Sequence, residues 1–154
     1  MKIIKSDGDK LTFQITKIEK RLLLDLLALY PLVPALFQPL SRTANPADIQ
    51  ADQRLLEESL AAHKQENKKQ LGVIIDQINR SQESAGGYRF SLSSDQIEGL
   101  LQVLNDIRVG SWQKLGSPDA PQKKAIELNE QNAHNAWAME VAGLFQMALL
   151  SARD

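Results

Sequence analysis

The sequence predicts a predominantly helical α+β fold, with about four helices and a small antiparallel β-sheet. One observation is an Asp-Gly pair that separates two short alternating segments near the N-terminus. A second is a set of helix-capping signals, each followed by apolar residues every three or four positions. The third is size: 154 residues, 43% hydrophobic and 24% charged, fit one globular domain. We therefore expect residues 1–154 to form a single helical domain with an N-terminal β-hairpin.

The sheet is expected to begin with this hairpin. Residues 2–5 and 11–15 flank the turn, and glycine at position 8 supplies the positive φ angle that a tight turn needs. Residues 88–93 alternate between polar and apolar side chains, which predicts a third strand beside the hairpin. The preceding segment, residues 81–87, is expected to be a loop.

Capping motifs set the expected starts of the first and third helices. Thr16 and Glu19 form a capping box, and the helix that follows should run to residue 29, before Pro31. Two overlapping boxes, Ser93-x-x-Gln96 and Asp95-x-x-Glu98, precede a helix that we expect to end near residue 115.

The second and fourth helices are predicted mainly from apolar periodicity. Residues 46–80 should form the longest helix, entered through Asn45-Pro46 and polar in its middle. Residues 128–151 should form the last helix, which is apolar on two sides. Such a helix is either central to its fold or part of an oligomer contact, and a central position is favoured.

Composition excludes several classes of function. The 18 basic and 19 acidic residues give a net charge of −1, so no nucleic-acid or anionic-membrane partner is expected. The chain has no cysteine, which excludes disulfides, thiolate metal sites and a cysteine nucleophile. The most apolar stretch, residues 22–37, is interrupted by Asp25, Pro31 and Pro34, and residues 1–7 lack the apolar run of a signal peptide. A cytoplasmic location is the simplest expectation.

Arg108 is the leading candidate for a functional side chain. A helical wheel places it within the apolar stripe of the third helix, where a guanidinium would need acceptors. It could form a core ion pair, the favoured interpretation, or open an anion or carboxylate site. Asn105 and Trp112 lie one turn to either side, so the three form a ridge, whereas Asp106 should face solvent. The acidic candidates for the ion pair are Glu19, Asp25, Glu57, Glu58 and Glu140.

The two histidines are the remaining acid–base or metal-ligand candidates. His63 precedes Glu66 by three residues, and His134 follows Glu130 by four, so each pair can share a helix face. Metal sites in helical bundles need further inward carboxylates, so no metal is predicted. His134 is kept as a binding candidate, joining Asn105, Arg108 and Trp112. Phosphate-binding and nucleophile-elbow motifs do not occur in the sequence, and no cofactor is predicted.

The chain as a whole resembles an uncharacterised bacterial family that is known as a domain of unknown function. The likeness rests on four features: the Asp7-Gly8 hairpin with its leucine-rich helix, Pro34-Ala35-Leu36-Phe37, Asn45-Pro46-Ala47-Asp48, and Leu104-Asn105-Asp106-Ile107-Arg108. The resemblance implies a mostly helical fold and a connection with regulated proteolysis. It implies no known activity and no functional residues.

Two function classes stay open. The favoured one is a non-catalytic interaction or regulatory module that binds a protein partner or itself, with a homodimer as one form. Its support is the charge-balanced helical scaffold, the apolar and proline-rich residues 31–40, and the lack of catalytic motifs. The alternative is an enzyme, or a protein that binds a small molecule or anion, with its site around Arg108.

Overall fold

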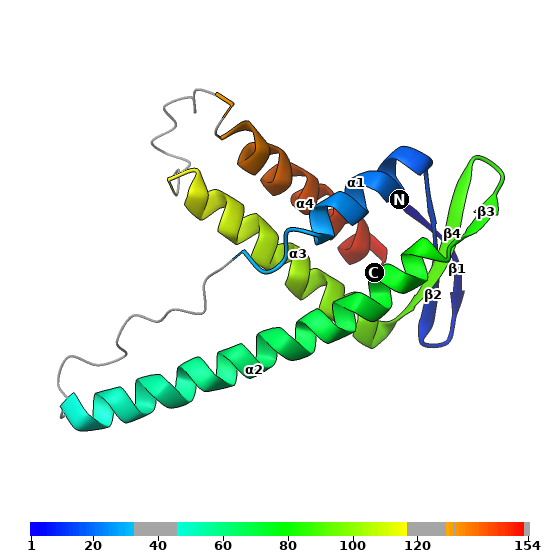
Figure 1. The fold of residues 1–154 in the computed structure, drawn as a ribbon. Coiled ribbons are helices and arrows are strands. Elements are labelled where there is room, and N and C mark those ends of the chain that lie inside the picture. Colours follow the sequence, from blue (N-terminus) through cyan, green and yellow to red (C-terminus); the bar gives the residue numbers. More distant parts are fainter. Residues whose placement is uncertain (33–45, 117–128, 131, 153–154) are drawn as a thin grey trace.

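The structure is a computed structural model that describes residues 1–32, 46–116, 129–130 and 132–152, and of residues 46–49 the backbone alone. It confirms the α+β fold, predominantly helical, with a four-stranded antiparallel sheet in the order β1-β2-β4-β3. The helices lie to one side of the sheet, and α3 and α4 run antiparallel and side by side (Figure 1). The predicted proline-rich segment lies outside the described residues from position 33 onward.

The sheet contains the predicted hairpin, β1 (Lys2–Asp7) and β2 (Lys10–Ile15), with Gly8 at a φ of 59° in the turn. The predicted third strand is β4 (Gly87–Ser93), which pairs with β2. Alternation puts Phe13 and Phe90 opposite each other in the core, with ring centroids 5.7 Å apart.

A fourth strand, β3 (Gln82–Ser84), lies where a loop was expected, so that prediction is wrong. Its three residues are polar and too few to show alternation. The strand forms because Gly86, with a φ of 86°, lets the chain reverse and pair with the start of β4.

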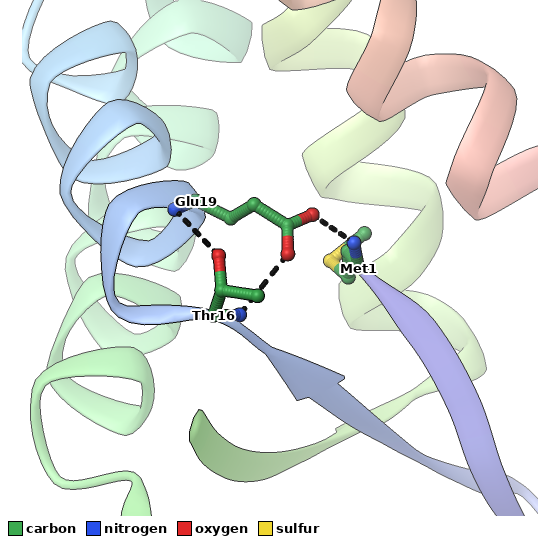
Figure 2. A network of polar contacts seen from close by, with 3 residues as sticks. All are labelled: Met1, Thr16 and Glu19. Atoms are coloured by element: carbon green, nitrogen blue, oxygen red, sulfur yellow. Dashed lines mark hydrogen bonds and ion pairs between the residues drawn. The ribbon is translucent and has the colours of Figure 1, made fainter. Parts of the chain in front are cut away.

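Helix α1 (Lys17–Leu27) begins at the predicted capping box and ends two residues earlier than expected. The Thr16 hydroxyl accepts from the Glu19 amide at 3.1 Å, and the Glu19 carboxylate accepts from the Thr16 amide at 3.1 Å (Figure 2). The same carboxylate binds the ammonium group of Met1, which ties β1 to the start of α1. Burial alone would raise the pKa of Glu19, but the Met1 ammonium and the Thr16 bonds hold it below its usual range.

Helix α2 (Pro46–Asn79) is the longest, as predicted. Its second half buries Leu71, Ile74 and Ile78 in the core, while its first half projects beyond the other described elements (Figure 1). The polar middle meets a polar partner at Asn67, which hydrogen-bonds the Tyr30 side chain.

Helix α3 (Ser94–Lys114) uses the first of its two predicted boxes, with Ser93 as the N-cap and Gln96 as its partner. Helix α4 (Ala133–Ala152) starts five residues after the predicted position 128, which lies outside the described residues. Asn129 and Asn132 exchange bonds between side chain and backbone, at 2.8 and 2.9 Å. This reciprocal pattern is that of a capping box, and the Ala133 amide also donates to the Asn129 carbonyl at 2.9 Å.

Candidate functional site: a groove between α3 and α4

An apolar groove of about 640 Å³ lies between α3 and α4. Two of the predicted binding residues, Arg108 and Trp112, form its α3 wall together with Val109. The α4 wall was not predicted as a site. It consists of Met139, Glu140, Gly143, Leu144 and Met147.

Small buried residues let the two helices approach beneath this groove. Gly110 and Ser111 are buried in α3, and Ala138 and Ala142 are buried in α4. Side chains of this size allow two helix backbones to come close, and α3 and α4 form the most extensive helix–helix contact among the described elements. The floor of the groove is therefore formed by packed helices rather than by a loop.

The outer face of α4 carries large apolar side chains that the described residues leave in solvent. Leu144 and Met147 are each 66% exposed, and Leu150 is 51% exposed. They lie at steps of three residues, on the side of the helix opposite buried Ala142 and Phe145. Helix α4 is thus apolar on two sides, as expected. It is not central to the described fold, because one of those sides is uncovered.

Arg108 is exposed, which corrects the expectation that it lies in the buried stripe. Early in α3 the buried residues include Ile97 and Leu101, but later they include Val103 and Gly110, which lie further round the helix. The buried face therefore turns around the helix axis, and Arg108 falls outside it. A core ion pair is not formed with any of the acidic residues proposed for it that the structure describes.

The predicted ridge on α3 does exist. The Arg108 guanidinium donates a hydrogen bond to the Asn105 side-chain oxygen at 3.3 Å, and Trp112 is half-buried one turn further on. Asn105 is exposed and does not line the groove. The ridge thus presents a cation and an indole to the groove, with an amide that orients the cation.

His134 is not brought into the groove. It is exposed in the first turn of α4, where its ring stacks on Trp137 with centroids 5.6 Å apart. His63 is exposed on α2. Within the described ranges, no group of three or more His, Asp or Glu residues could hold a metal ion.

Asp106 is half-buried, so the expectation that it faces solvent is wrong. Its carboxylate accepts a hydrogen bond from the Leu32 amide at 2.7 Å, which fixes the chain after α1 against α3. Nearby, burial raises the pKa of Tyr30, and the charge of Asp106 adds to this effect, although the bond to Asn67 lowers it. This cluster is closed and structural, and it lies away from the groove.

A second, more polar cleft of about 470 Å³ lies between the C-terminal end of α2 and the sheet. Arg80 and Arg89 line it, and Arg80 pairs with Asp76 at 3.5 Å. Both arginines are exposed. No sequence pattern links these residues, because they come from separate elements.

In the described part of the chain, no helix is both long enough and apolar enough to cross a bilayer. Comparisons of the chain with models of protein families, with curated proteins and with solved structures found no match. The resemblance to a bacterial family therefore stays a prediction, and the groove has to be interpreted from its own chemistry.

Proposed function

We propose that this protein is a non-catalytic interaction module of the cytoplasm, which binds a protein partner through the α3–α4 groove. The observation that carries the proposal is the outer face of α4, where Leu144, Met147 and Leu150 stand in solvent beside the groove. Single exposed apolar residues are normal on a protein surface, but three on one helix face form a patch. Such a patch gains free energy when a partner removes it from water.

The residue types in the groove favour a protein as the ligand. Trp112 and Arg108 belong to the types that contribute most binding energy at protein interfaces. Met139 and Met147 add flexible, polarisable side chains that adapt to an apolar partner surface. A groove between two helices also fits the docking of an amphipathic helix.

The alternative function, a small-molecule or anion site at Arg108, has weaker support. Arg108 shares the groove with Glu140, whose negative charge reduces the attraction for an anion. The rest of the lining offers few polar groups to orient a small substrate. Among the described residues, the groups with shifted pKa values are Glu19 and Tyr30, which have structural partners and do not line the groove. The resemblance stated above adds regulated proteolysis as the proposed setting.

Affinity capture with matched variants tests this function. Leu144→Glu puts a charge into the outer face of α4. Ile18→Glu makes the same change at a site on α1 that is 74% exposed. Each tagged variant would be compared with the unaltered protein in its native extract by mass spectrometry, after circular dichroism has verified its fold. We expect at least one protein, which can be an untagged copy of this chain, to be retained by the unaltered protein and by Ile18→Glu but lost from Leu144→Glu.

Equal retention by all three proteins would show that the groove is not the docking surface. Retention of no protein at all, including a second copy, would contradict the interaction function. Small-molecule and anion screening against Arg108 would then address the alternative.

A further inference from the structure

We infer that the occupant of the groove is a second copy of this chain, related by a two-fold axis that places Arg108 of each copy against Glu140 of the other. This inference rests on the proposed function and names its partner. Three features of the molecule support it: the charges at the groove, the placement of the apolar strip and the shape of α4 at Gly143.

The groove carries one charge of each sign, on opposite walls. Arg108 belongs to α3 and Glu140 to α4, and the two form no ion pair with each other. The guanidinium instead contacts Asn105, at 3.3 Å, and Glu140 is exposed. Among the described residues neither charge has an oppositely charged partner, so both can meet opposite charges on an incoming surface.

Two-fold symmetry matches this arrangement. In an interface of this type, when residue i of one copy contacts residue j of the other, j also contacts i. A surface with one cation and one anion on either side of an apolar strip is complementary to itself, because a half-turn brings each charge onto its opposite. A strongly acidic or strongly basic partner would instead be attracted by one wall and repelled by the other.

The apolar strip lies on the line along which two copies would meet. Gly143, Leu144, Met147 and Leu150 follow Glu140 at helical spacing on the outer face of α4. Apart from the adjoining residues and backbone of α4 itself, no atom lies within 4 Å of the position that a Cβ would take at Gly143. The helix backbone is thus accessible at this point, so a large side chain such as Leu144 of the second copy can pack against it. The dimer buries both strips, and a dissociation constant on the order of micromolar is expected for an interface built around one exposed helix face of each copy.

Charge reversal tests the inference. Sedimentation equilibrium would compare the full chain with Arg108→Glu, Glu140→Arg and the double variant. The protein concentration would run from about 1 to 200 μM, a range chosen around the expected dissociation constant. Both side chains are exposed, so the fold should tolerate each change. We expect each single reversal to raise the dissociation constant at least about tenfold, as loss of a close charge pair can do, and the double variant to restore it to within about threefold.

Arg21→Glu is the matched control, because it reverses an exposed arginine on α1, away from the groove. It should leave the dissociation constant unchanged. A monomer across the whole concentration range would overturn the inference, as would a dimer that is insensitive to both single reversals or not restored by the double variant. In each of these cases the proposed function still stands if a different protein is captured in the groove-dependent way described above.

Discussion

Asp106 and Arg108 are two residues apart in α3, yet they face entirely different surroundings. Asp106 is half-buried and accepts a hydrogen bond from the Leu32 amide at 2.7 Å. Arg108 is exposed, contacts Asn105 and faces an apolar groove. The segment after α1 covers α3 at Asp106, whereas Arg108 lies at the rim of the α3–α4 contact, where the described residues leave a groove. The comparison teaches that polarity alone does not tell which side of a helix its fold will cover.

The largest expected difference is in the free energy of unfolding, between two variants that each remove one of these side chains. Asp106→Ala leaves the Leu32 amide without its charged acceptor, which costs about 1.5–3 kcal/mol. The better helix propensity of alanine offsets roughly 0.5 kcal/mol of this loss. Arg108→Ala removes an exposed side chain and should change the free energy of unfolding by less than about 0.5 kcal/mol. Urea denaturation at a protein concentration below the dimer dissociation constant measures both.

Asp106→Asn provides the control, because its amide oxygen can still accept from Leu32, and its cost should be smaller than that of alanine. If Arg108→Ala destabilises the monomer as much as Asp106→Ala does, the distinction between a closed and an open side of α3 is wrong.

The sequence predicted well those features of the fold that depend on neighbouring residues. The Asp-Gly turn and the capping boxes at Thr16 and Ser93 involve residues within a few positions of one another, and all three are present. Strand β3 was missed because its pairing depends on β4 rather than on its own three residues. Local chemistry thus set most element boundaries. Before α4, Asn129 and Asn132 exchange the reciprocal bonds of a capping box, although the regular helix begins only at Ala133.

The candidate site was predicted only on one of its two walls. Arg108 and Trp112 were identified from α3, whereas Glu140 and Met147 belong to α4 and join them only through helix packing. The wheel misplaced Arg108 because it assumes that one face stays buried along the whole helix. The signal that could have found the second wall was present, since α4 is apolar on two sides. Assigning one of those sides to the surface required the tertiary contacts.

A smaller effect should sharpen the description of the closed side. Tyr30→Phe removes the hydroxyl that bonds Asn67, and we expect a loss of about 1 kcal/mol in the free energy of unfolding near neutral pH. The pKa of Tyr30 is raised in the folded state, so unfolding at alkaline pH releases a proton. Its contribution is therefore fully present below the unfolded value of about 10 and is lost as the pH rises through the folded value.

Denaturation of Tyr30→Phe and the unaltered protein at several pH values between about 8 and 11, a range that includes the unfolded value of about 10, checks the sign. The stability difference between the two proteins should narrow as the pH rises, because phenylalanine does not titrate. A difference that stays constant or widens would mean that the phenol is not held in its neutral form by the closed side.

The smallest effect concerns the open side and separates stability from association. Gly143→Ala replaces glycine inside α4, where nothing lies within 4 Å of the new methyl group, so the monomer should gain about 0.5–1 kcal/mol in the free energy of unfolding. The same methyl group stands in the groove, where it should hinder a second copy and raise the dimer dissociation constant.

Gly72→Ala is the matched control, because it lies in α2 with equally open space and should give the stability gain alone. If both substitutions stabilise the monomer but neither changes the dissociation constant, the second copy does not approach α4 at Gly143. If Gly143→Ala alone weakens the dimer, the stability of the monomer and its association with a second copy depend on separate faces of α4.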